Sequence, residues 1–309
     1  YRKLNNLNKW VQYLLLSDGI GYINGKKFYG LNFDGINNYV AIQNYNYTTS
    51  VTELTVESWF RLPSSGANVL ASFDRNSYWR IATGDQIPTD KIGVMFDGDG
   101  GQVDDFCSTT TVTNGQWYHI AFVFNNGDAY LYINGVQENS VTSGTTLGTG
   151  STRYGFLGVG SEASIFDGNI GPEDYFSGEQ REFRIWSTAK TQTEIQNNMY
   201  SELSGDEKGL EVYYKFNEGT GTTLTDYANS NNGTIINGIP WTDIFNISWI
   251  NENNGNITID SKAEHIDELL ILPKLATSEQ IDEWINIERP FYDVVQDYDE
   301  SITPNNVKM

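Results

Sequence analysis

The sequence of 309 residues is poor in the side chains that build covalent cross-links and transition-metal sites. It contains one cysteine, Cys107, and two histidines, His119 and His265. A single cysteine excludes an internal disulfide framework and a cysteine-based zinc site, and two histidines exclude a metal centre built on several imidazoles. Of the metals that bind through carboxylate and carbonyl oxygens, calcium (Ca2+) is the main candidate.

Basic residues are also scarce, with 19 Lys and Arg against 40 Asp and Glu, and the net charge is −21 at pH 7. This field repels phosphate backbones and anionic membrane surfaces, so it disfavours nucleic-acid partners and favours cations. No run approaches the roughly 18 apolar residues of a membrane span, so we expect no membrane insertion. Because the chain begins at Tyr1, we expect a fragment or a processed product.

Aromatic residues, by contrast, make up 14% of the chain. That share can supply a large buried core, which excludes intrinsic disorder. Apolar and polar residues alternate in Leu54–Leu62, Trp117–Phe124 and Ala129–Ile133, and Asn-Gly pairs at 126–127 and 134–135 are typical of tight turns. Alternating runs joined by turns predict an antiparallel β-sandwich.

Two segments of the sequence occur in a second copy. Residues 182–195 align without gaps on residues 268–281, and in each a predicted strand precedes a short helix that a capping box opens. The predicted hairpin at 117–136 matches a shorter hairpin at 10–28. Because the outer copies bracket the inner ones, we expect one sandwich to be inserted into a second, partial sandwich.

The inner segment carries a series of short motifs in a fixed order. They are Leu31–Gly35, Val56–Trp59, Gly115–His119, Leu131–Gly135, Phe176–Gly178, Phe183–Trp186 and Tyr213–Gly221. In this order they resemble the LamG-like, pentraxin-like jelly rolls of the concanavalin A-like lectin superfamily. The resemblance implies an all-β jelly-roll sandwich with short capping helices. It gives a complete jelly roll at 30–242, a partial one at 1–29 and 243–292, and a C-terminal tail or linker at 293–309.

The outer segment, at 266–293, resembles tail proteins of phages that infect Firmicutes. This resemblance implies a virion appendage or baseplate component, with an extracellular or bacterial surface location as the alternative. The expected partners are a bacterial cell-surface polysaccharide and other tail proteins. Phage fibres are commonly trimeric, so we expect a homo-oligomer, which would also raise avidity.

A calcium site is predicted in one of two places. The acidic loop Asp97–Asp105 offers four carboxylates but lacks the EF-hand pattern, and a solvated hairpin tip is the alternative. The family resemblance instead implies calcium ligands at Asp34, Asp226, Asn229 and Asn232. The alternative for Asp34 and Asn232 is that they cap turns.

Carbohydrate binding needs aromatic faces flanked by amides or carboxylates. The candidate residues lie in three loops: Tyr78, Trp79, Asp99, Asp104, Asp105, Phe166 and Tyr175. For Trp79, packing in the core is the alternative.

No catalytic residues are expected, because the sequence has no Glu-x-Asp-x-x-Glu run that would place paired carboxylates on one strand. His119 lies in an apolar run, where a structural role is favoured. We therefore expect a lectin-like, non-catalytic protein. The alternatives are a structural appendage that binds no sugar and, less favoured, a glycan-degrading enzyme on the same fold.

Overall fold

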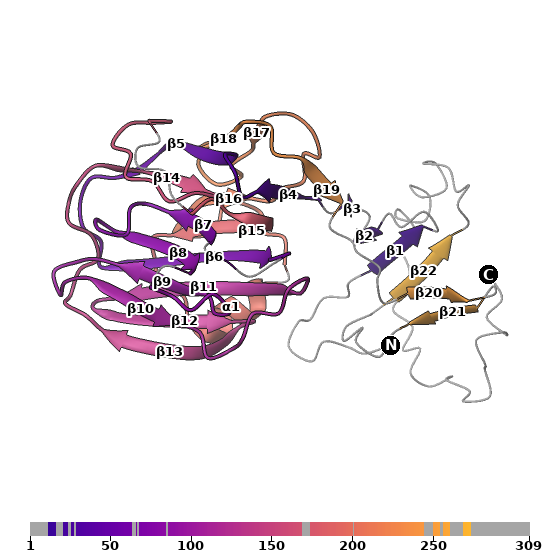
Figure 1. The fold of residues 1–309 in the computed structure, drawn as a ribbon, viewed down its shortest axis with the longest axis horizontal. Helices are drawn as coiled ribbons and strands as arrows, with labels where there is room; N and C mark the ends of the chain where they lie inside the picture. The colour runs from indigo at the N-terminus through magenta and orange to yellow at the C-terminus, as the bar shows by residue number, and fades with distance from the viewer. Residues whose placement is uncertain are drawn as a thin grey trace. The chain divides into compact units, whose positions relative to one another are not determined.

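Alternating apolar side chains form strands throughout this computed structural model, which divides into two units. The larger unit contains residues 29–242, and the smaller contains residues 1–28 and 243–309 (Figure 1). The structure describes residues 29–243 except 64–65, 67, 85, 169–173 and 200, together with six strands at 12–16, 21–23, 26–27, 250–253, 256–259 and 268–272.

We call one sheet of the larger unit the helix-side sheet, because helix α1 (Gln192–Asn198) packs on its outer face. In spatial order its strands are β13 (Val136–Thr142), β12 (Asp128–Ile133), β11 (Trp117–Asn125), β6 (Glu53–Arg61), β15 (Ser177–Trp186), β4 (Tyr29–Asp34) and β19 (Trp241–Asp243), and β16 (Leu210–Tyr214) also pairs with β15. The hairpin predicted at 117–136 is confirmed, with β11 and β12 antiparallel.

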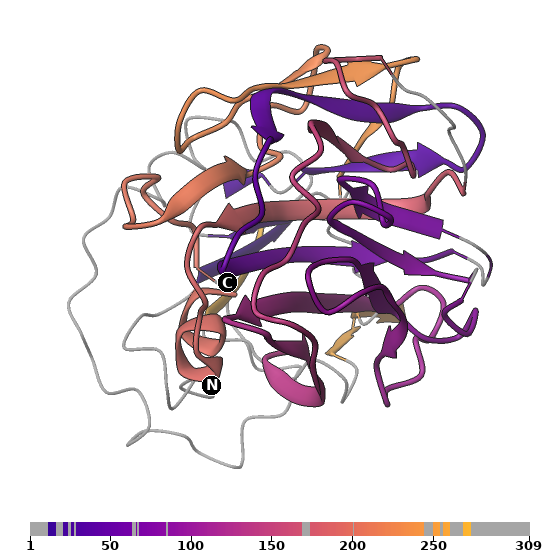
Figure 2. The same ribbon diagram turned by 90° about the vertical axis from the view of Figure 1, so that its left-hand side faces the viewer.

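We call the other sheet the loop-side sheet, because the connection from β14 to β15 folds over its outer face. In spatial order its strands are β10 (Val103–Cys107), β9 (Gly93–Phe96), β8 (Trp79–Thr83), β7 (Asn68–Ser72), β14 (Arg153–Leu157), β5 (Tyr39–Tyr47), β18 (Gly233–Ile236) and β17 (Thr223–Leu224). Strands from the start of the unit thus lie beside strands from its end, as Figure 2 shows by colour.

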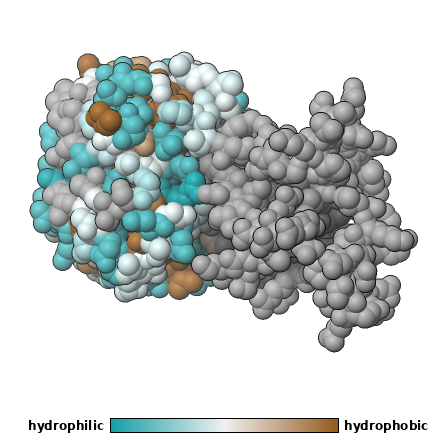
Figure 3. All heavy atoms as spheres, turned by 45° about the vertical axis from the view of Figure 1, so that its right-hand side comes forward, coloured by the Kyte–Doolittle hydropathy of each residue, from teal (hydrophilic) through white to brown (hydrophobic). Residues whose placement is uncertain are grey.

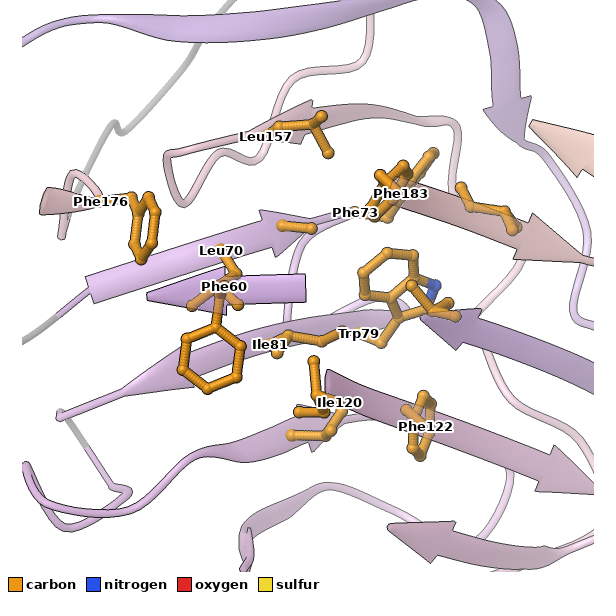
Figure 4. Close-up of a cluster of buried hydrophobic side chains, with 14 of the residues drawn as sticks. Phe60, Leu70, Phe73, Trp79, Ile81, Ile120, Phe122, Leu157, Phe176 and Phe183 are labelled. Carbon is orange, nitrogen blue, oxygen red and sulfur yellow. The ribbon is translucent and has the colours of Figure 1, made fainter. Parts of the chain in front are cut away.

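The core lies between the two sheets and consists of the inward side chain of every second residue. Phe60 and Phe122 enter it from the helix-side sheet, and Leu70, Ile81 and Leu157 enter it from the loop-side sheet (Figure 4). All five are at most 1% exposed. Two antiparallel sheets around one core confirm the predicted all-β sandwich.

Helix α1 begins as its sequence predicts. Thr191 is its N-cap: the Thr191 hydroxyl accepts a hydrogen bond from the amide of Glu194, and the carboxylate of Glu194 accepts one from the amide of Thr191. Ile195 is the buried residue of the helix and packs on Ala121 and Val123 of β11. The described residues contain no helix with the length and apolarity needed to span a membrane. The second predicted helix, after Thr277, lies outside the described residues.

In the smaller unit, four strands form a sheet in the order β22 (Glu268–Leu272), β1 (Gln12–Leu16), β2 (Gly21–Ile23) and β3 (Lys26–Lys27). The hairpin predicted at 10–28 is confirmed by β1 and β2, and β22 pairs with β1 in parallel. β20 (Ile250–Asn253) and β21 (Asn256–Ile259) form a separate hairpin. The partial outer jelly roll stays a prediction, and residues 293–309 lie outside the described residues.

Candidate functional site

The outer face of the loop-side sheet carries a cluster of aromatic side chains. Along β5, Val40 and Ile42 point into the core, whereas Tyr39 and Ala41 belong to a separate cluster on the outer face. Phe156 of β14 joins this outer cluster, with its ring centroid 5.9 Å from that of Tyr39. The two-residue period of a strand separates the two groups.

The connection from β14 to β15 folds back over this face. The amide of Tyr154 donates to the carbonyl of Ala163 (3.0 Å), and the hydroxyl of Tyr39 donates to Oδ1 of Asp167 (2.9 Å). Tyr154 and Tyr175, one at each end of the connection, both pack against the outer cluster. The connection is therefore tied to the sheet through hydrogen bonds and aromatic contacts.

We call Tyr39, Tyr154, Phe166, Asp167 and Tyr175 the tyrosine patch. Tyr154 and Tyr175 are half-buried, and Phe166 is 39% exposed. Asp167 is exposed, and only its Oδ1 accepts a hydrogen bond from the described residues. Aromatic faces bind the apolar side of a sugar ring, and a carboxylate accepts its hydroxyls. The patch combines both groups on one face.

Two residues predicted to bind carbohydrate, Tyr78 and Trp79, are instead part of the core. Trp79 lies among the buried side chains of Figure 4, 5.0 Å from the ring of Phe73. Tyr78 stacks on Tyr47 at 4.6 Å and donates its hydroxyl to the carbonyl of Ser151 (2.9 Å). Both are 0% exposed, so neither can contact a ligand at the surface, and the prediction for them is wrong.

The acidic residues predicted to bind sugar do not join the tyrosine patch. Asp104 and Asp105 lie on β10, at the far edge of the loop-side sheet. Four strand spacings, about 19 Å in total, separate β10 from β14. Asp99 accepts hydrogen bonds from the amides of Thr145 and Thr146 and from the Thr145 hydroxyl (2.7 Å each), and these bonds lower its pKa to about 2. Asp99 therefore anchors one loop to another.

The residues predicted to bind calcium act as hydrogen-bonding partners of the backbone. The carboxylate of Asp226 accepts four backbone amides, from Tyr213, Ala228, Asn229 and Asn231, at 2.8–3.1 Å. Those four bonds occupy the positions at which a carboxylate would bind a cation.

The other predicted calcium ligands have similar roles. Oδ1 of Asp34 accepts the amides of Ile36 and Asn37, and Oδ1 of Asn232 accepts the amide of Asp226. No group of three His, Cys, Asp or Glu that could hold a metal occurs among the described residues. These contacts are those of turn caps, and the calcium site stays a prediction.

Ionisable side chains are buried on the outer face of the helix-side sheet. Glu57, His119 and Arg184 lie on adjacent strands, each 1% exposed. Arg184 donates to Glu182 (2.8 Å), Trp186 donates from Nε1 to Oε1 of Glu57 (2.7 Å), and Nε2 of His119 lies 3.4 Å from Oε2 of Glu57. We call these five residues the buried charge network.

The buried charge network does not have the properties of a hydrolytic site. Burial, the largest influence, raises the pKa of Glu57, but the hydrogen bond with His119 and the charge of Arg184 outweigh it and hold the pKa below its usual value. Glu57 and Glu182 are 1% and 8% exposed, so a polysaccharide cannot reach either carboxylate. Their pairing with Arg184 indicates a structural role.

The comparison with protein families gives a direct answer for the larger unit. Residues 34–196, just over half of the chain, match the laminin G form of the concanavalin A-like lectin/glucanases superfamily. The chain belongs to this superfamily. The predicted resemblance of the inner segment is thereby confirmed, whereas the resemblance to phage tail proteins stays a prediction. No curated protein matches the chain.

The chain is also similar to solved structures. A Bacteroides ovatus protein with a provisional assignment as a carbohydrate-binding protein is 22% identical to this chain, with a TM-score of 0.56. The match covers 71% of this chain and 60% of the Bacteroides protein. A heptameric SAP-like pentraxin from Limulus polyphemus is 12% identical, with a TM-score of 0.44 over 77% of this chain and 98% of its own.

Sequence reasoning found Phe166 and Tyr175 of the tyrosine patch but missed Tyr39, Tyr154 and Asp167. Asp167 follows Phe166 directly in the predicted loop, and only the hydrogen bond from Tyr39 reveals its place. The signal for Tyr39 was available, since it alternates with Val40 at the start of β5 and so must face outward in this superfamily's sandwich.

Proposed function

We propose that this lectin-superfamily protein recognises a carbohydrate without cleaving it, and that the tyrosine patch is the binding surface. The observation that carries the proposal is the patch itself: partly exposed Tyr154 and Tyr175 pack on the cluster that contains Tyr39, and Tyr39 donates a hydrogen bond to the exposed carboxylate of Asp167, which follows Phe166 in the chain. The paired carboxylates of the buried charge network are inaccessible, which supports binding over hydrolysis. The provisional carbohydrate-binding assignment of the Bacteroides ovatus structure is consistent with this function.

A glycan array probed with the full chain tests the proposal. We expect a defined set of glycans to bind, and we expect Tyr154→Ala and Tyr175→Ala to lower affinity for them at least about tenfold, because each removes a stacking ring. Tyr130→Ala is the matched control, since Tyr130 is a half-buried tyrosine on β12 of the helix-side sheet. Binding that all three variants retain, or no binding to any glycan, would contradict the proposal and favour the structural-appendage alternative.

A second measurement separates recognition from hydrolysis. The full chain, incubated with each glycan that it binds, should release no new reducing ends. Release that survives purification and is lost in Tyr175→Ala would establish the enzyme alternative instead.

We further propose that the protein works on a virion appendage and binds a bacterial surface polysaccharide as a homo-oligomer. Support comes from the resemblance of residues 266–293 to tail proteins. Most of these residues lie outside the described part of the chain. Single carbohydrate sites are weak, so several copies would be needed for firm attachment. Sedimentation of the purified chain should show an oligomer that adsorbs to Firmicute cell walls, and a monomer that ignores every wall tried would contradict this.

A further inference from the structure

We propose that the glycan recognised at the tyrosine patch carries protonated primary amines, as a de-N-acetylated hexosamine does. This inference rests on the proposed function and adds the chemical class of the sugar. Two features of the patch support it, its charge and its aromatic surface. A third observation comes from another part of the fold, where the chain binds the ammonium group of one of its own lysines.

The connection that forms part of the patch carries charge of one sign. The connection from β14 to β15, residues 158–176, contains four acidic residues and no Lys or Arg. Glu162 and Asp167 are exposed. Together with the net charge of −21, this surface repels uronic or sialic acids and attracts cations.

Two arginines flank residues of the patch, Arg153 before Tyr154 in the chain and Arg80 beside Asp174, and both have carboxylate partners within the chain. Nε of Arg153, on β14, lies 2.5 Å from Oδ2 of Asp74. Arg80 is 1% exposed and lies 3.8 Å from Asp174. Burial therefore keeps Arg80 from an anionic sugar, and the charge of Arg153 is already paired with that of Asp74.

The aromatic surface suits a cation as well as a sugar ring. Ammonium groups bind over the faces of tyrosine rings, and the attraction grows when a carboxylate is close. In the patch, the half-buried rings of Tyr154 and Tyr175 pack on the same cluster as Tyr39, whose hydroxyl holds Asp167 at 2.9 Å. An amino sugar would present an apolar ring face and an ammonium group to these partners together.

The same chain shows this arrangement with one of its own side chains. Nζ of Lys215 lies 4.3 Å from the ring centroid of Tyr227 and 2.9 Å from Oε1 of Glu202. This fold thus already places an ammonium between a tyrosine face and a carboxylate, on a side chain that is 10% exposed. At the tyrosine patch the ring and the carboxylate come from the protein, and the ammonium would come from the ligand.

Calorimetric titration of the full chain with two oligosaccharides tests the inference. Hexamers of glucosamine and of N-acetylglucosamine have the same backbone, and acetylation removes the charge. We expect the glucosamine hexamer to bind at least about tenfold tighter at low salt and to weaken as salt rises, because exposed charges are screened. Asp167→Asn should remove most of that preference.

Asp128→Asn is the matched control. Asp128 lies on β12 of the helix-side sheet and, like Asp167, accepts one hydroxyl at Oδ1, here from Thr142 (2.7 Å). It changes the net charge by the same amount and should leave both affinities unchanged. If Asp128→Asn weakens binding as much as Asp167→Asn does, the effect belongs to the overall field and the inference is wrong.

Three further outcomes are decisive. Equal affinity for the two hexamers, or binding of other glycans only, overturns the amino-sugar class and leaves the proposed function standing. Oligolysine that binds the patch as tightly as the glucosamine hexamer also overturns it, because recognition would then need no sugar. Failure to bind any glycan on the array contradicts the proposed function itself.

Discussion

The outer faces of the two sheets both carry aromatic and ionisable side chains. Those of the buried charge network, on the helix-side sheet, are buried, whereas most of those in the tyrosine patch, on the loop-side sheet, are at least partly exposed. On the helix-side sheet, Arg184 is 1% exposed and donates to the carbonyls of Asn198 (2.9 Å) and Ser201 (2.7 Å) as well as to Glu182. Its donors thus fasten the end of α1 to the sheet. On the loop-side sheet, Tyr175 stays half-buried and Asp167 exposed.

The difference teaches that a perturbed ionisable group is not by itself a sign of function. Glu57 has the shifted pKa and the His and Arg neighbours of a catalytic residue, yet it is only 1% exposed. The patch, by contrast, can be reached by a ligand, since Tyr154, Phe166, Asp167 and Tyr175 are at least partly exposed. On the face of the larger unit that Figure 3 shows, hydrophilic and hydrophobic residues are mixed, so apolar exposure on that face does not single out a site either.

We call the outer face of the helix-side sheet, where the buried charge network lies, the closed face. Its sharpest test is Arg184→Met. Removing the guanidinium leaves Glu57 and Glu182 buried without their positive partner, so we expect the free energy of unfolding to fall by about 3–5 kcal/mol. Urea unfolding measures this. Lys208→Met is the control, since Lys208 is exposed and should change stability by no more than about 0.5 kcal/mol. A loss below about 1 kcal/mol would show that the network is not needed for stability.

A smaller loss is expected from Asp226→Asn. Asp226 supports the closed face through Tyr213, whose amide it accepts and whose hydroxyl donates to Glu182. An asparagine has one acceptor oxygen in place of two, so some of the four amides lose their partner, at a cost of about 1–3 kcal/mol. Because the amides stand where a cation would bind, the loss should be the same in calcium and in EDTA. A loss present only in calcium would support the predicted metal site.

The sequence analysis predicted the sandwich correctly because its signals are local. The alternation in Trp117–Phe124, the Asn126-Gly127 turn and the cap at Thr191 each lie within a few residues and are all confirmed. The carbohydrate site was predicted less well. Trp79 follows a turn, as an exposed residue would, but its side chain packs on Phe73 and is 0% exposed.

The parts that could not be predicted depend on contacts between distant residues. The hydrogen bond from Tyr39 to Asp167 joins residues 128 positions apart, and the sequence around neither residue predicts it. The same holds for Asp226, whose residue type fits a calcium ligand and a turn cap equally well. Only the four amides around it distinguish the two roles.

Helix α1 covers part of the closed face, and its cap provides a milder test. Thr191→Ala removes the hydroxyl that accepts the amide of Glu194, so we expect a loss of about 1 kcal/mol in urea unfolding. Thr191→Ser keeps the hydroxyl and should restore most of the stability. An equal loss in both variants would mean that the threonine methyl group, and not the cap, is what matters.

The smallest effect is expected at Asp99, an exposed carboxylate that belongs to neither face. Its pKa of about 2 in the folded chain lies below the value of about 3.9 for an unfolded aspartate, because the amides of Thr145 and Thr146 stabilise the charged form. A lowered pKa means that the ionised group stabilises the fold above about pH 4 and that this contribution is lost as the pH falls towards 2. The melting temperature of Asp99→Asn should therefore lie below that of the unsubstituted chain by a constant amount at pH 5–7. The gap should narrow between pH 4 and pH 2.

Asp105→Asn, which makes the same change of charge on β10, serves as the control. A gap that stays constant down to pH 2 would show that the two loops are held together without the charge of Asp99.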